Sequence, residues 1–169
     1  MLYRRMTEVI GALGLLAVLS APALADSEKA KLIGDHEVPL VLTTGEGTLT
    51  AKLTDRTTIE FELTYSGLEG TVTQAHIHIG QRNVNGGIVL FFCSNVTTPT
   101  PPPGTPACPG PHAGTVTGTL TAADVVAVPT QGVSAGDIGL VIDAIREGKA
   151  YANVHSDMSP AGEIRGQIK

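Results

Sequence analysis

The sequence predicts an all-β protein, an antiparallel sandwich or barrel with one short helix. Beyond residue 25 the chain is rich in Thr, Val, Ile and Gly, and polar and apolar residues alternate with period two in many segments. Such alternation is typical of strands that have one buried face. Clusters of Gly, Asn, Ser and Pro separate these segments and indicate turns. Alternation and turn clusters together favour an all-β domain over a helical one.

The first 25 residues have the features of a cleavable signal peptide. Arg4 and Arg5 precede an apolar stretch, residues 9–19, that is shorter than the roughly 20 residues of a membrane-spanning helix. Residues 23–25, Ala-Leu-Ala, then form an A-x-A cleavage pattern. We therefore expect cleavage near Ala25, no membrane span, and a periplasmic or secreted location. The alternative is an N-terminal membrane anchor that is retained.

Residues 26–169 are predicted to form one acidic domain. Their number, about 144, suits a single domain with its own core. The whole chain has 11 basic and 16 acidic residues, and removal of Arg4, Arg5 and Glu8 with the signal peptide leaves a net charge near −6. An acidic domain without a cluster of Lys and Arg is not expected to bind nucleic acid or an anionic lipid surface.

Eight segments have the composition and alternation of strands. In the third of them, Ile59, Phe61 and Leu63 fall on one face and Glu60 and Glu62 on the other, as in a sandwich with one wet side. The predicted strands are residues 37–42, 47–53, 58–65, 73–79, 87–92, 114–121, 149–156 and 162–168.

Two helical segments interrupt the predicted strands. Thr121 and Asp124 have the spacing of a capping box, which indicates one or two helical turns. Ser134 is the expected N-cap of a longer helix that ends at Gly148. The core-facing residues of this longer helix recur at i, i+3, i+4 and i+7, and they are Ile138, Val141, Ile142 and Ile145.

The chain has two cysteines, Cys93 and Cys108, and we expect them to form a disulfide bond, because exported proteins meet an oxidising environment. They belong to a Pro-rich loop, residues 93–111, that holds seven of the 11 prolines. Closing a loop of this length contributes up to about 3 kcal/mol in the chain-entropy model. The prolines already restrict the unfolded loop, so the contribution of the crosslink is smaller than this limit.

Three of the five histidines are predicted to share one face of the sheet. Strand alternation places His76 and His78 on the face opposite their apolar neighbours, and the same alternation turns His155 away from the core. If the two predicted strands that hold them, residues 73–79 and 149–156, are neighbours in the sheet, the three imidazoles are suited to hold one copper or zinc ion. His112, in the loop after the cysteines, is a candidate fourth ligand. The alternative is that these histidines are solvated polar side chains on the outer face.

Five motifs occur in a fixed order along the chain: residues 35–39 (Asp-His-Glu-Val-Pro), 75–78 (Ala-His-Ile-His), 85–87 (Asn-Gly-Gly), 151–156 (Tyr-Ala-Asn-Val-His-Ser) and 160–167 (Pro-Ala-Gly-Glu-Ile-Arg-Gly-Gln). Together they resemble the CHRD domain, a module repeated in chordin and found singly in microbial secreted proteins. The resemblance covers residues 31–169. It implies an immunoglobulin-like β-sandwich or barrel similar to Cu/Zn superoxide dismutase, and it implies no established enzymatic activity.

Two main functions are therefore open. The first is a non-enzymatic binding or structural module whose partner is an unknown protein or a metal ion, since no G-x-S-x-G, H-E-x-x-H or phosphate-binding loop is present. The second is a copper or zinc protein, including a redox-active one, that uses His76, His78 and His155. A secreted glycosidase using Glu60 and Glu62 is a third candidate, but strand alternation explains these two carboxylates as solvent-facing.

Overall fold

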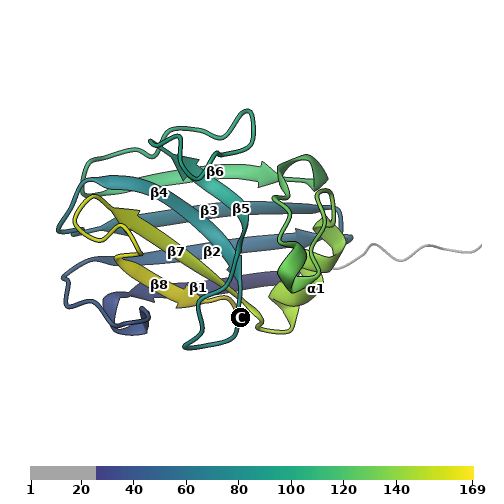
Figure 1. Cartoon of the computed structure of the whole chain (residues 1–169), viewed down its shortest axis with the longest axis horizontal. Coiled ribbons are helices and arrows are strands. Elements are labelled where there is room, and N and C mark those ends of the chain that lie inside the picture. The colour runs from purple at the N-terminus through teal and green to yellow at the C-terminus, as the bar shows by residue number, and fades with distance from the viewer. Residues whose placement is uncertain (1–25) are drawn as a thin grey trace, which may run out of the picture.

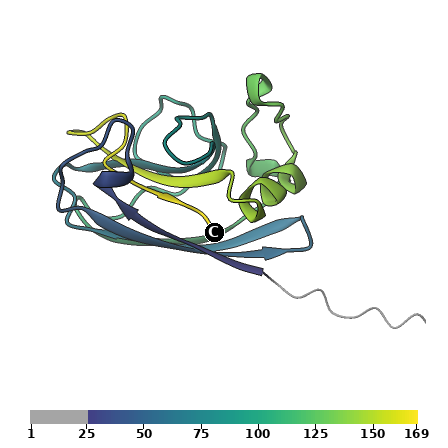
Figure 2. The ribbon, with the colours of Figure 1, turned by 90° about the horizontal axis from the view of Figure 1, so that it is seen from below.

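The computed structural model describes residues 26–169, which form two layers of antiparallel strands in a nearly closed barrel (Figures 1 and 2). The strands are β1 (Asp26–Ile33), β2 (Glu46–Thr54), β3 (Thr58–Ser66), β4 (Val72–Ile79), β5 (Ile88–Ser94), β6 (Gly114–Leu120), β7 (Ala150–Ser156) and β8 (Ile164–Gln167). Their order in the sheet is β5-β4-β7-β8-β1-β2-β3-β6. The prediction of an all-β fold is confirmed.

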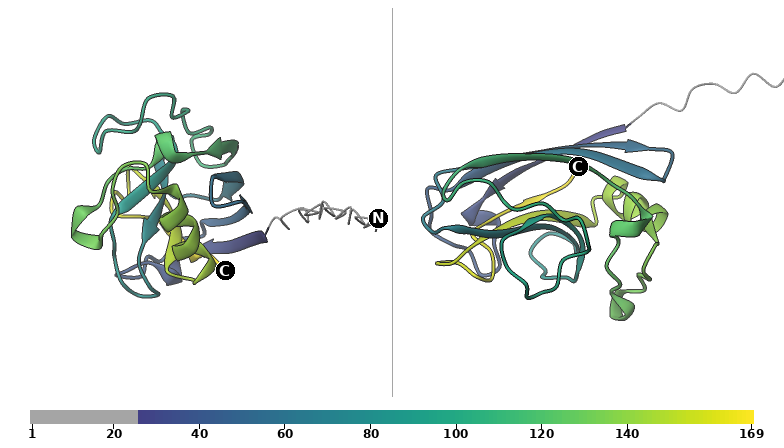
Figure 3. Two further views of the ribbon diagram at one scale, coloured as in Figure 1. Left: turned by 90° about the vertical axis from the view of Figure 1, so that its right-hand side faces the viewer. Right: turned by 90° about the horizontal axis from the view of Figure 1, so that it is seen from above.

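One α-helix, α1 (Ile138–Arg146), lies within the described part of the chain, across one end of the two layers (Figure 3). The four residues of its predicted apolar stripe are all buried. Asp137 rather than Ser134 precedes the helix, and the Asp137 side chain accepts a hydrogen bond from the Ser134 backbone. Short 3-10 helices span Gly34–His36 (η1), Ala122–Asp124 (η2) and Pro129–Gln131 (η3). The capping box at Thr121 and Asp124 is present.

The core lies between the two layers and follows the predicted alternation. Along the β2–β3 pair, Leu49 lies opposite Leu63, and both side chains are buried. On the outer face of the same pair, Lys52 and Glu60 form an exposed ion pair of 3.2 Å. An exposed pair of this kind contributes at most about 1 kcal/mol, so apolar burial holds these strands in register.

The N-terminal part of the sheet differs from the prediction. Residues 37–42 are not a strand, and their place in the sheet is taken by β1, which pairs along its whole length with β2. Pro39 lacks the N–H group that a central strand needs, which opposes a strand in this segment. The segment instead runs over the outer side of β7, where the Glu37 carboxylate accepts a hydrogen bond from Asn153.

The predicted disulfide bond is confirmed, and it holds the Pro-rich loop against β5. The Cα atoms of Cys93 and Cys108 are 4.9 Å apart. Beside the bond, the Asn95 side chain donates to the carbonyl of Cys108 and accepts from its backbone N–H. The Ser94 N–H also donates to the carbonyl of Pro106. The loop is therefore an ordered cover along the β5 edge.

Residues 1–25, the predicted signal peptide, lie outside the described residues, and their cleavage stays a prediction. Between residues 26 and 169, no helix is long and apolar enough to cross a membrane.

Candidate metal centre

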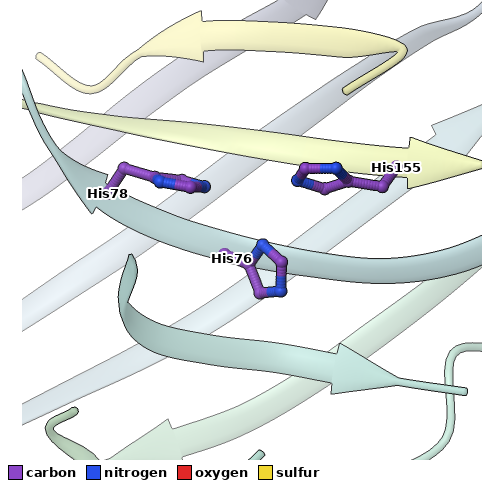
Figure 4. Close-up of side chains that lie close together, drawn as sticks. All are labelled: His76, His78 and His155. Atoms are coloured by element: carbon purple, nitrogen blue, oxygen red, sulfur yellow. The ribbon is translucent and has the colours of Figure 1, made fainter. Parts of the chain in front are cut away.

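Two neighbouring strands, β4 and β7, bring three histidines together. His76 lies opposite Asn153 in the antiparallel register, and Gln74 lies opposite His155, which makes His76 and His155 diagonal neighbours. His78 follows His76 on the same face of β4 (Figure 4). The apolar residues between them, on both strands, face the core. The structure thus places the three predicted ligands on one face of one pair of strands.

The three histidines are buried, although they point away from the hydrophobic core. The exposed fractions of His76, His78 and His155 are 0%, 7% and 6%. Three irregular segments, residues 37–41, 80–87 and 157–162, pack along this side of β4, β7 and β8 and contact its side chains. The face that strand alternation predicts is right, but the covering segments leave little of the three side chains open to solvent.

Two glycines allow the covering segments to approach so closely. A Cβ atom at Gly86 would lie 1.6 Å from the carbonyl oxygen of Ile79. A Cβ atom at Gly162 would lie 2.5 Å from the Asn153 amide nitrogen, and Gly162 has a φ of 130°, which side chains disfavour. Both glycines belong to the motifs that the sequence singles out, and the close packing explains why.

The three imidazole rings surround a common point. The centroid of the His76 ring lies 4.9 Å from that of His155 and 5.5 Å from that of His78, and the other two centroids are 6.3 Å apart. Figure 4 shows one nitrogen of each ring facing the space between them. One nitrogen from each ring lies within 4.8 Å of the other two, so a point exists that is no more than about 2.8 Å from all three. Metal–imidazole bonds are about 2.0 Å, so a shift of at most about 0.8 Å per ring would complete the site.

Backbone carbonyls set the tautomers of two of the rings. His78 Nδ1 lies 3.0 Å from the carbonyl oxygen of Gly86, and His155 Nδ1 lies 3.0 Å from that of Pro160. A carbonyl oxygen only accepts hydrogen bonds, so both Nδ1 atoms carry the proton and both Nε2 atoms carry a lone pair. Each ring therefore presents a nitrogen that is ready to bind a cation.

The third ring, His76, has the opposite tautomer. Its Nε2 donates to the Gln74 side-chain oxygen at 3.0 Å, which leaves the lone pair on Nδ1. The three lone-pair nitrogens are buried and have no hydrogen-bond partner within the described structure. Each such orphaned atom costs about 1–3 kcal/mol. Imidazoles that hold one nitrogen in a hydrogen bond and free the other are typical of metal ligands.

Burial keeps the three rings neutral. Desolvation, assisted by repulsion between the rings, lowers the pKa of His76 to about 2. Desolvation also lowers the pKa of His78, to about 4, and that of His155, whose hydrogen bond to Pro160 opposes the shift. A metal ion binds only the neutral form of imidazole, so the ligands need no deprotonation at neutral pH.

A buried stack of side chains flanks the cluster. The Tyr151 ring is parallel to the His78 ring, with centroids 4.7 Å apart, and the Arg165 guanidinium lies 3.4 Å from the Tyr151 centroid. Because β7 lies between β4 and β8, Tyr151 separates the histidine from the arginine. Arg165 also donates to the side chain of Asn85 and to the carbonyl of Val84, which ties residues 80–87 to β8.

Glu37 is the acidic group on the covering segments that is most perturbed. Burial raises its pKa to about 7, against the opposing effects of Arg165 and the hydrogen bond from Asn153. Below pH 7 the folded protein therefore favours the protonated, neutral form of the Glu37 side chain. The stability that this provides is fully present below the unfolded pKa of 4.5 and is lost as the pH rises through 7.

We expect Glu37→Gln to make the fold less sensitive to pH between 5 and 8. A shift of this size corresponds to about 3 kcal/mol, and glutamine stays neutral while its side-chain oxygen still accepts from Asn153. Urea unfolding of the wild type and of Glu37→Gln at pH 5 and pH 8 gives the change in unfolding free energy of each protein between the two pH values. The histidines contribute equally to both changes, so their contribution cancels when the two are subtracted. Glu60→Gln, at the exposed pair with Lys52, is the control. Equal pH sensitivity in wild type and Glu37→Gln would contradict the assignment.

The structure does not bring the other histidines to the cluster. His112 is exposed, and its Nδ1 lies 3.0 Å from the carbonyl oxygens of Leu68 and Gly70. It is absent from the group of potential metal ligands, which within residues 26–169 consists of the three histidines on β4 and β7. His36 lies in η1 and is likewise outside the group.

Sequence reasoning missed the groups that orient the ligands. Gln74 stands two residues before His76 on the same strand face, and this spacing was the one available signal for its role. The carbonyls of Gly86 and Pro160 carry no sequence signal, because every residue has such a group. Their positions depend on how the covering segments fold.

The described residues form a two-layered β-barrel that has one disulfide bond and a group of buried histidines. A β-module with a disulfide bond fits an extracellular protein. Comparison with models of known families matches residues 29–168 to the CHRD domain, and the chain belongs to the CHRD domain family. The resemblance noted in the sequence is thereby confirmed, and it supports a non-enzymatic module in general. No curated protein and no solved structure matches the chain.

Proposed function

We propose that the chain is an exported CHRD module that binds one copper or zinc ion through His76, His78 and His155 and catalyses no reaction. Export follows from the predicted signal peptide, with cleavage near Ala25 and a periplasmic or secreted destination. The disulfide bond and the family are consistent with that destination. The metal ion is then the partner that the module meets outside the cytoplasm.

The observation that carries this proposal is the convergence of three buried, unpaired imidazole nitrogens. Polar atoms buried without partners destabilise a fold, and protein interiors contain few of them. Three in one place, each on a ring whose second nitrogen is fixed by a hydrogen bond, are accounted for by a ligand that accepts three lone pairs. A cation of the Cu or Zn type is such a ligand.

Metal analysis of protein purified without a histidine tag tests the proposal. After reconstitution with copper or zinc and desalting, we expect about one equivalent of metal per chain, as in other single-ion sites. His112→Gln is the matched control, because it removes an exposed histidine outside the cluster and should leave this content unchanged. Less than about a tenth of an equivalent of metal after every reconstitution, with Cu(I), Cu(II) and Zn(II) in turn, would refute the proposal, because a site of three converging ligands retains an ion that suits it.

A further inference from the structure

The charge of the ligand set limits which ion the proposed centre accepts. The three imidazoles are neutral ligands, and in the described part of the chain no carboxylate or thiolate joins them within bonding range. A bound ion would therefore keep its full charge in a buried position. The Born cost of burying an ion rises with the square of its charge, so a divalent ion costs about four times as much as a monovalent ion of similar size.

The surroundings add to this cost. Arg165 is 2% exposed and carries a positive charge, and its guanidinium lies 3.4 Å from the centroid of the Tyr151 ring, which stacks on His78. Its repulsion of a metal ion doubles when the ion is divalent. Glu37, which offsets Arg165, is itself held toward its neutral form by burial. The other buried carboxylate, that of Glu163, is not part of the histidine group, and it accepts hydrogen bonds from Thr43 and Ser156.

The number of ligands also favours a monovalent copper ion over zinc. Zinc with three protein ligands takes a water or substrate as its fourth ligand, which requires an open position. The described structure contains cavities of about 140, 190 and 260 Å³, and none of these three is lined by a histidine of the cluster. Copper in its monovalent state is a closed-shell ion that three ligands satisfy, and imidazole is among the ligands that copper accepts.

We infer that the three-histidine centre is selective for monovalent copper over divalent zinc and divalent copper. This inference rests on the proposed function and specifies the ion. The selectivity comes from burial, from neutral ligands and from the nearby guanidinium.

Anaerobic competition titrations test the inference. The probes are Cu(I) supplied as its acetonitrile complex against the chromophoric chelator bicinchoninate, and Zn(II) and Cu(II) against chromophoric chelators of their own. We expect one Cu(I) per chain, bound at least about a hundredfold more tightly than Zn(II) or Cu(II), given the fourfold burial cost of the divalent charge. Zn(II) or Cu(II) bound as tightly as Cu(I), at one equivalent, would overturn the selectivity and leave the proposed function standing. Binding of none of these ions would overturn both.

The variant Gln74→Glu tests the electrostatic cause. Glutamate keeps the shape of Gln74 and the acceptor for His76 Nε2, but it adds one negative charge at the centre. Because a divalent ion gains twice as much from this charge, we expect the preference for Cu(I) over Zn(II) to narrow by about tenfold or more. The control Thr48→Glu adds the same charge at an exposed position of β2, outside the covering segments, and should leave the preference as it is. An unchanged preference in folded Gln74→Glu would overturn the inference.

Discussion

Replacing His76 with leucine is expected to abolish metal binding while leaving the metal-free fold about as stable as before. Loss of an outer hydrogen-bond partner of a metal ligand already costs 10–100-fold in affinity, so loss of a ligand should cost more than about a hundredfold. The leucine fills a site that is fully buried, and it removes the orphaned Nδ1 along with the ring. A swap of similar volume costs less than about 1.5 kcal/mol in the core.

Thermal unfolding with and without metal measures both effects. At a metal concentration one hundred times the dissociation constant, the wild type should gain about 2.7 kcal/mol, and His76→Leu should gain nothing at the same concentration. His112→Gln should respond as the wild type does, because His112 lies outside the cluster. If His76→Leu lost several kcal/mol without metal and still responded to it, the three histidines would be structural rather than ligands.

Replacing Glu163 with alanine is expected to destabilise the fold by about 3–5 kcal/mol, because it leaves several hydrogen-bond donors without an acceptor, at about 1–3 kcal/mol for each buried one. The Glu163 side chain is fully buried. Its carboxylate accepts hydrogen bonds from the hydroxyls of Thr43 and Ser156 and from the backbone N–H groups of Glu69 and Gly70. Alanine would leave the backbone N–H groups of Glu69 and Gly70 without this acceptor. It would also open a cavity where the carboxylate now lies.

Urea unfolding at pH 7 measures this loss, and Glu163→Gln separates its causes. Glutamine keeps the volume and one oxygen acceptor, but its amide group meets a donor, so we expect a smaller cost of about 1–3 kcal/mol. The exposed Glu60→Gln serves as the reference for a surface change, within about 0.5 kcal/mol of wild type. A cost below about 1 kcal/mol for Glu163→Ala would show that the network contributes little to the fold.

Much of the sheet was predictable from alternation, and the exceptions have physical reasons. β3 follows its period-two pattern closely, so Ile59 and Leu63 are buried as predicted. β1 was not predicted, because its first half, residues 26–29, is polar and is held by pairing with β2 rather than by burial. Residues 37–42 were wrongly predicted as a strand, because local composition does not reveal that Glu37 bonds to Asn153 on β7.

The grouping of the three histidines was predictable from the sequence, but their surroundings were not. Strand alternation placed His76, His78 and His155 on one face, and the pairing of β4 with β7 brought them together. Their burial was not predictable, since irregular segments without periodicity cover them. The covering depends on long-range contacts such as that between Arg165 and Asn85, which lie 80 residues apart in the chain.

A crystal structure of the metal-loaded protein, with anomalous scattering measured at the absorption edge of the metal, shows directly whether the three histidines hold the ion. We predict a single anomalous peak about 2.0 Å from His76 Nδ1, His78 Nε2 and His155 Nε2, with the three rings drawn together. A peak at another position, such as the exposed His112, or no peak among the three rings in protein reconstituted with copper and zinc, would contradict the assignment of this cluster as a metal centre.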